Sequence, residues 1–152
     1  MLLLGVLIVA APLSHPARGA SLPRLALLLL CAAYIQGGLV KLFDFGGAVA
    51  EMQHFGLPLP AVAAALTIVL ELGAPALIVW GRQRWLGALA LAGFTLAATF
   101  MANRFWEAPA EARFMMTNAF FEHIGLVGAL LLVAWLDLRA RRARNDWRTV
   151  HA

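Results

Sequence analysis

Four stretches of the chain are apolar almost throughout, and shorter segments rich in polar residues, proline or glycine separate them. Each stretch is close to the roughly 20 residues that a helix needs to cross a bilayer core about 30 Å thick. The pattern therefore predicts an all-α protein, a compact bundle of four transmembrane helices in antiparallel, up-down order. The predicted spans are residues 22–40, 59–80, 85–102 and 114–136.

The connecting segments refine this prediction. The second and third spans are joined only by GRQR at residues 81–84, and so short a connection makes the two helices antiparallel neighbours. The longer segment after the first span mixes apolar and polar residues, which predicts a short helix at about residues 47–54 lying in the membrane interface. Small residues such as Gly87, Gly125 and Gly128 predict close contacts of the third and fourth spans with other helices.

The composition agrees with a membrane protein and not with a soluble domain. Of the 152 residues, 62% are hydrophobic and 13% are charged, whereas a soluble domain has about 25% charged residues. With the N-terminus in the cytoplasm, the outer segments hold only three of the 12 basic residues, Lys41, Arg104 and Arg113. This bias follows the positive-inside rule, so we expect both termini in the cytoplasm. It also explains the net charge of +4 without a nucleic-acid partner.

The two ends of the chain differ from the four spans. Residues 1–21 begin with an apolar run that is too short to span, and it is either a signal peptide or a segment lying in the interface. We favour the interface, since no basic residues precede the run. Residues 139–152 form a basic cytoplasmic tail after the membrane domain of residues 22–138. The arginines expected against anionic lipid headgroups are Arg139, Arg141, Arg142 and Arg144.

Polar residues within or beside the apolar spans are the candidates for function. A charge at mid-bilayer costs about 3 kcal/mol or more, so such a side chain is expected to face protein or a cavity. The depth of each polar residue below the outer surface can be estimated from the helical rise of about 1.5 Å per residue. The polar residues of the first, second and fourth spans all fall between the outer surface and the midplane. We therefore expect one polar pocket shared by these spans. Its members would be Gln36, Lys41, Glu71, Asn118, Glu122 and His123.

Several of these residues allow two interpretations. Lys41 either anchors the first helix in the headgroup layer or pairs with Glu122 or with a ligand. Glu71 is either a protonated acid bonded to a backbone carbonyl that Pro75 leaves free, or an acid that handles protons. His123 is rotated by about 100 degrees from Glu122 around the helix, so it would face a neighbouring helix by itself.

Metal and cofactor motifs are weak in this sequence. Glu51 and His54 have the Glu-x-x-His spacing, but a di-iron bundle uses that motif twice. A haem held by two histidines inside the membrane would need a second histidine beside His123. Cys31 is the single cysteine, so the chain has no dithiol. We predict no metal site and no covalently bound cofactor.

Several motifs, taken in order, resemble the DoxX family of small four-helix membrane proteins. They are GGLVKL at the end of the first span, HFGLPLP before the second, LELGAPALIVWG within the second, and FFEHIGLVGALLLVAW in the fourth. The resemblance covers about residues 22–138. It implies a bacterial or archaeal protein of the inner membrane, linked to quinones, to an oxidoreductase complex and to oxidative stress. By position it points to Lys41, Glu71, Glu122 and His123.

Three functions remain open from the sequence. In the first, the protein binds a quinone or a similar small hydrophobic molecule in an outer-leaflet pocket, where Lys41 or His123 donates a hydrogen bond and Glu71 or Glu122 exchanges protons. Gln36 and Asn118 would complete that pocket, and a redox partner protein would supply electrons. In the second, the protein transports a small solute or protons with Glu71 as the titrating group. In the third, it is a scaffold whose polar groups only lock helix packing.

Overall fold

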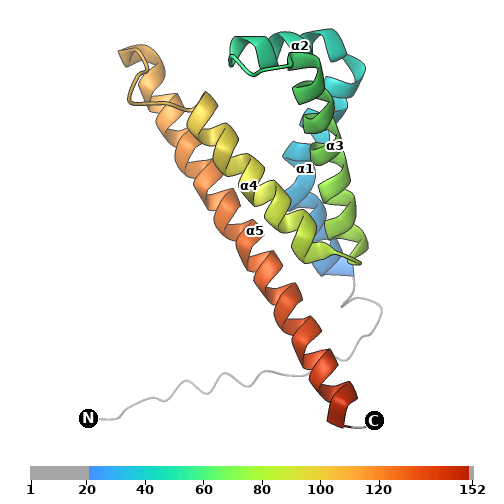
Figure 1. The fold of residues 1–152 in the computed structure, drawn as a ribbon. Coiled ribbons are helices and arrows are strands. Elements are labelled where there is room, and N and C mark those ends of the chain that lie inside the picture. The colour runs from blue at the N-terminus through green and yellow to red at the C-terminus, as the bar shows by residue number, and fades with distance from the viewer. Residues whose placement is uncertain (1–20, 151–152) are drawn as a thin grey trace, which may run out of the picture.

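A computed structural model describes residues 21–150 of the chain. An interfacial segment or signal peptide was predicted at residues 1–21. All of this segment except its last residue lies outside the described residues. Figure 1 shows that this part is built from helices, with no strand among residues 21–150. The helices are α1 (Ser21–Phe43), α2 (Phe45–His54), α3 (Pro60–Trp80), α4 (Arg84–Ala102) and α5 (Ala110–Val150).

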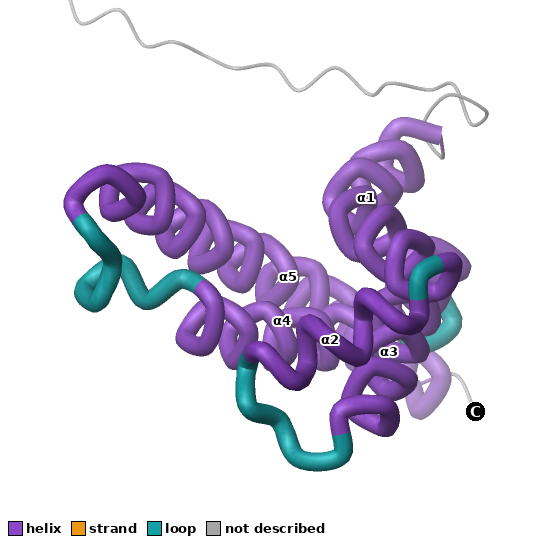
Figure 2. The backbone as a smooth tube through the Cα atoms, turned by 90° about the horizontal axis from the view of Figure 1, so that it is seen from above, coloured by secondary structure: helices purple, strands orange, loops and turns teal. Residues whose placement is uncertain are grey.

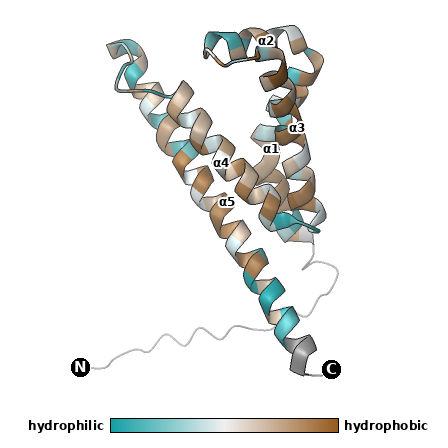
Figure 3. Ribbon diagram, viewed as in Figure 1, coloured by the Kyte–Doolittle hydropathy of each residue, from teal (hydrophilic) through white to brown (hydrophobic). Residues whose placement is uncertain are grey.

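Four of these helices are long and apolar enough to cross a membrane, namely α1, α3, α4 and α5. The prediction of an all-α protein with four spans is thus confirmed. Hydrophilic residues gather at α2 and the α4–α5 turn at one end, and at the α3–α4 turn and the C-terminal part of α5 at the other (Figure 3). Between these ends the helices are mostly hydrophobic, as a bilayer core requires.

The short helix expected in the first loop is present as α2. It begins at Phe45, where the side chain of Asp44 accepts a hydrogen bond from the Gly47 N–H at 2.9 Å and so satisfies a free donor of the first turn. Seen from above, α2 lies across the ends of the long helices (Figure 2). Its buried residues Ala48 and Met52 pack on Ala64 near the start of α3.

The long helices form an open row instead of the compact bundle that the sequence suggested. α1 packs on α3, α3 on α4, and α4 on α5, while α2 packs on α3 and α1. Within residues 21–150 no comparable packing joins α1 to α5. Figure 1 shows the α1–α3 pair diverging from the α4–α5 pair towards the end that carries α2. The first, second and fourth spans therefore do not pack into one tight cluster. A space lies between the two helix pairs, and all three spans contribute residues to it.

α3 and α4 approach each other closely. Gly81, at a φ of 81°, ends α3 in the left-handed conformation that glycine adopts easily, and the chain turns directly into α4. A Cβ atom on Gly87 would lie 2.6 Å from the Ala74 carbonyl oxygen, so only glycine allows this approach. The prediction of close contacts is confirmed for Gly87. It is wrong for Gly125 and Gly128, which are exposed and have open space at the Cβ position.

α5 continues through the predicted start of the basic tail. At about 1.5 Å per residue, a helix of this length measures about 60 Å, twice the bilayer core. Buried Asp137 accepts a hydrogen bond from the Trp85 N–H at 3.3 Å and from Arg141 Nε at 2.7 Å, and Arg141 also donates to the Arg82 carbonyl. Arg141, expected at lipid headgroups, is thus held by protein groups that fasten α5 to the α3–α4 turn.

Candidate functional site

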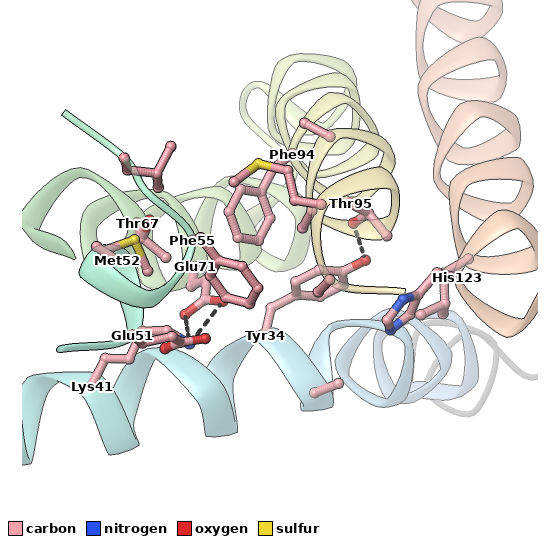
Figure 4. Close-up of a pocket in the computed structure, with 17 residues that line it drawn as sticks. Tyr34, Lys41, Glu51, Met52, Phe55, Thr67, Glu71, Phe94, Thr95 and His123 are labelled. Carbon is pink, nitrogen blue, oxygen red and sulfur yellow. Dashed lines mark hydrogen bonds and ion pairs between the residues drawn. The ribbon is translucent and has the colours of Figure 1, made fainter. Parts of the chain in front are cut away.

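A cavity of about 420 Å³ lies between the two helix pairs, close to α2. Residues from all five helices line it, and most of them are apolar, including Met52, Phe55, Phe94 and Met101. Figure 4 shows the polar side chains that interrupt this lining at separate places. They are Tyr34, Lys41, Glu51, Thr67, Glu71, Thr95 and His123. An apolar cavity of this size with few polar groups is typical of a binding site for a small organic molecule.

Lys41 and Glu71 form an ion pair at one side of the cavity. The Lys41 ammonium lies 3.3 Å from Glu71 Oε2 and donates a hydrogen bond to Glu71 Oε1 at 3.5 Å. Both side chains are largely buried, at 16% and 8% exposure. Glu51 of α2 lies 3.8 Å from the same ammonium but is much more exposed. One cation therefore holds two carboxylates from different helices together.

The backbone around Glu71 adapts to this pair. A Cβ atom on Gly38 would lie 2.8 Å from Leu72 Cδ2 and 3.1 Å from Glu71 Cβ, so the glycine lets α3 approach α1 closely at Glu71. Pro75, inside α3, has no N–H for the carbonyl of Glu71 four residues earlier. The sequence allowed the Glu71 side chain to bond such a carbonyl, but its partner is Lys41. Its Oε2 atom is buried and accepts no hydrogen bond within residues 21–150.

Tyr34 and Thr95 close the deep side of the cavity. The Tyr34 hydroxyl lies 2.6 Å from Thr95 Oγ1, and Thr95 Oγ1 donates to the Leu91 carbonyl at 2.7 Å. Because the single proton of Thr95 is used in that bond, Tyr34 must donate to Thr95. This bond joins α1 to α4. Beneath it lies the buried core of Cys31, Ala74, Ile78, Ala88, Leu91, Ala92, Leu130 and Ala134.

His123 enters the cavity from α5 and is oriented by Asn103, the residue that directly follows α4. Asn103 Nδ2 lies 2.8 Å from His123 Nδ1. An amide nitrogen only donates, so Nδ1 accepts and the neutral ring carries its proton on Nε2. In Figure 4 the ring lies on the opposite side of Tyr34 from Lys41. The N–H of Nε2 is therefore a donor available to a ligand.

A second hollow continues the cavity towards the α2 end of the molecule. The two share Phe55, Met101 and Ala102, and the second is also lined by Arg104 and Glu107 of the α4–α5 turn. Rings from the end of α4, from that turn and from α5 pack edge to face beside it. They are Phe100, Phe105, Trp106, Phe120 and Phe121.

Comparison with known proteins identifies the family. A sequence model of the DoxX family matches residues 24–104, and the inner membrane protein YphA of Escherichia coli is 30% identical over 119 residues, which cover 76% of this chain and 85% of YphA. The chain belongs to the DoxX family. It is a multi-pass protein of the inner membrane. No solved structure matches it.

The DoxX family match contains part of the site. Lys41 and Glu71 fall within residues 24–104, as do Tyr34 and Thr95, whereas His123 lies on α5 beyond the matched region. The whole lining of the cavity, except for His123 and Leu126 of α5, is thus made from family-matched sequence. The resemblance seen in the motif FFEHIGLVGALLLVAW extends beyond what the family model covers.

Only half of the predicted site residues of this DoxX-family chain reach the cavity. Lys41, Glu71 and His123 line it. Asn118 and Glu122 are exposed and do not, because the face of α5 that carries them is turned away from α4. Gln36 is exposed too and lines a shallow groove on the outer face of α1. The suggested pairing of Lys41 with Glu122 is therefore wrong.

Sequence reasoning missed other residues of this site. Tyr34, Thr95 and Asn103 gave no signal, since tyrosine, threonine and a loop asparagine are ordinary in and beside membrane helices. Glu51 was noticed only for its spacing from His54, and its actual contact is Lys41. Within the described residues, no group of three or more His, Cys, Asp or Glu side chains could hold a metal ion.

Proposed function

We propose that this DoxX-family protein binds a quinone, or a similar small ring molecule, in the cavity between α1–α3 and α4–α5, as part of a quinone-linked redox system. The observation that carries the proposal is an apolar cavity of about 420 Å³ with hydrogen-bonding groups at separated positions. A flat apolar ring with oxygen atoms at opposite ends matches that distribution of groups.

Each polar side chain of the cavity would have its own role in binding the ring. The Nε2–H of His123 would donate to one ring oxygen and the Lys41 ammonium would approach the other, since the two groups lie on opposite sides of Tyr34 (Figure 4). Glu71, held by Lys41, would exchange protons with the ring. Reduction of a quinone to a hydroquinone takes two electrons and two protons. A redox partner protein would supply the electrons, and this chain would bind the ring and move protons.

The closed floor of the cavity favours binding over transport. Tyr34 and Thr95 join across it, and Leu91 and Leu130 beneath them are fully buried. A transporter would have to open this packing during every cycle. Transport would be the better explanation if Glu71→Gln abolished movement of a solute into vesicles while quinone binding persisted.

The orientation of the protein follows from the charges. The bias of arginines towards the α3–α4 turn and the end of α5 supports a cytoplasmic location for both termini. α2 would then lie in the outer interface with Ala48 and Met52 towards the protein. The cavity, close to α2, would open at the outer leaflet.

The proposal is tested by titrating the purified protein in detergent with short-chain ubiquinone and menaquinone analogues and following its thermal unfolding. We expect saturable stabilisation of the wild type. Lys41→Met and His123→Leu should each weaken binding about tenfold, as expected for the loss of one hydrogen bond.

Glu122→Gln is the matched control, because Glu122 neighbours His123 on α5 but lies outside the cavity. It should bind like the wild type. Equal loss in Glu122→Gln and His123→Leu would mean that the cavity is not the binding site. The absence of any saturable shift in the wild type would contradict quinone binding itself.

A further inference from the structure

We propose that the cavity selects the reduced, hydroxyl-bearing form of its ring ligand, a hydroquinone, over the oxidised quinone. This inference rests on the proposed function and adds the redox state that the site prefers. It follows from the direction of the hydrogen bonds around the cavity, because these decide which protein atoms offer a proton and which accept one.

Tyr34 offers its oxygen to a ligand and not its proton. Thr95 gives its only hydroxyl proton to the Leu91 carbonyl at 2.7 Å, so the 2.6 Å contact between the Tyr34 and Thr95 oxygens uses the proton of Tyr34. Tyr34 lines the cavity with that proton already committed. The lone pairs of its oxygen remain, and these accept a hydrogen bond from a ligand.

Glu71 is a second acceptor in the same space. It is 6% exposed, and its Oε2 atom accepts no hydrogen bond from residues 21–150, although Lys41 lies 3.3 Å away as the counter-charge. A carboxylate has no proton to donate. A buried acceptor without a donor is costly, so a ligand that donates to Oε2 gains from satisfying it.

The two forms of the ring differ in what they can offer these acceptors. A quinone carries carbonyl oxygens that only accept, so beside Glu71 and Tyr34 it would place acceptor against acceptor. A hydroquinone carries two hydroxyl groups that donate, and their oxygens still accept from donors of the cavity, Lys41 and His123 Nε2–H. The hydroquinone therefore fits the donors and acceptors of the cavity better. Tighter binding of the reduced form also makes the bound ring easier to reduce.

The test uses three probes with the same carbon skeleton: trimethylhydroquinone, its oxidised trimethylbenzoquinone, and the dimethyl ether of the hydroquinone, which has no hydroxyl proton. Their affinities for the purified full-length protein in detergent are measured anaerobically by calorimetry. We expect the hydroquinone to bind about tenfold more tightly than either the quinone or the ether, the difference made by about one good hydrogen bond.

Two variants test the mechanism. Thr95→Val removes the acceptor of the Tyr34 proton, which then becomes free to donate to a carbonyl, so the preference for hydroquinone should fall about fivefold. Thr99→Val is the matched control. It makes the same change one turn away on α4, at a buried threonine whose hydroxyl bonds the Thr95 carbonyl and does not line the cavity. Its preference should equal that of the wild type.

The possible outcomes are distinct. Quinone binding that is equal to or tighter than hydroquinone binding in the wild type would overturn the inference while leaving the proposed function intact. A Thr95→Val variant with an unchanged preference would also overturn it, since the proton of Tyr34 would then play no part. Failure of all three probes to bind would overturn the proposed function together with the inference.

Discussion

Lys41 and Glu71 are both largely buried, and an isolated charge in such a place is unfavourable. Their pairing at 3.3 Å makes both tolerable, because each charge replaces part of the water that the other has lost. The carboxylate is the more buried partner, and it has an oxygen that accepts no hydrogen bond from residues 21–150. The arrangement is sufficient for stability and leaves one acceptor for a ligand.

Removal of Lys41 should be more harmful to stability than removal of the whole pair. Lys41→Met leaves Glu71 buried without its counter-charge, and we expect a loss of about 3 kcal/mol in the free energy of unfolding. The double variant Lys41→Met, Glu71→Leu should recover much of that loss. Unfolding in detergent or bicelles measures both.

Glu51→Gln is the control for this prediction. Glu51 contacts the same ammonium at 3.8 Å, but its side chain is 46% exposed, and exposed pairs contribute about 1 kcal/mol or less. If the double variant Lys41→Met, Glu71→Leu is less stable than Lys41→Met alone, the unpaired carboxylate of Glu71 is not the cause of the lost stability.

At the level of single residues, the sequence identified those that are unusual for their surroundings. Lys41, Glu71 and His123 stood out because charged and ring-nitrogen groups are rare in apolar spans. Tyr34 and Thr95 did not, because their hydroxyl groups are common there. Their part in the site depends on which oxygen gives its proton to which acceptor, and only the three-dimensional contacts decide that.

The helices are held together by two kinds of contact. α3 and α4 approach closely at Gly87, where the backbone of one helix meets the other. Next to the α3–α4 turn, α5 is fastened by Asp137, which accepts from the first turn of α4 and from Arg141. Towards the end that carries α2, the two helix pairs diverge (Figure 1), which leaves space for the cavity.

Gly87→Val should destabilise the protein by about 1–3 kcal/mol, the usual effect of overpacking. A side chain there would meet the Ala74 carbonyl at 2.6 Å and must force α3 and α4 apart. Gly93→Val, six residues later on α4, is the control because nothing lies within 4 Å of its Cβ position. Thermal unfolding of both variants in the same detergent makes the comparison. Similar midpoints for the two would argue against the close α3–α4 contact.

For the molecule as a whole, the charge bias predicts its orientation. Green fluorescent protein fused after residue 152 should be fluorescent, since both termini are expected in the cytoplasm. Alkaline phosphatase inserted in the α4–α5 turn, near Glu107, should be active because that turn is expected outside. The fluorescence and phosphatase activity of cells carrying each fusion measure this. A dark C-terminal fusion together with an inactive phosphatase insertion would show that the protein has the opposite orientation, with the cavity in the cytoplasmic leaflet.

The sequence by itself determined the elements of this protein. Length and apolarity are local properties, so the first three spans and α2 could be found within a few residues of their ends. The fourth span was found too, but α5 continues to Val150, well past its predicted end at residue 136. The basic residue bias and the family resemblance were likewise readable along the chain. What these features left open was which face of each helix points inward.

Only the tertiary structure decided that question. Lipid is as apolar as the protein interior, so the hydrophobic pattern of a spanning helix does not mark its packed face. The sequence therefore grouped Glu122 with His123 and Gln36 with Lys41, although in each case only the second lines the cavity. Packing between residues that are distant in the sequence sets the rotation of each helix about its axis and the close contact between α3 and α4. As a result, Lys41 pairs with Glu71, and the cavity lies beside this pair.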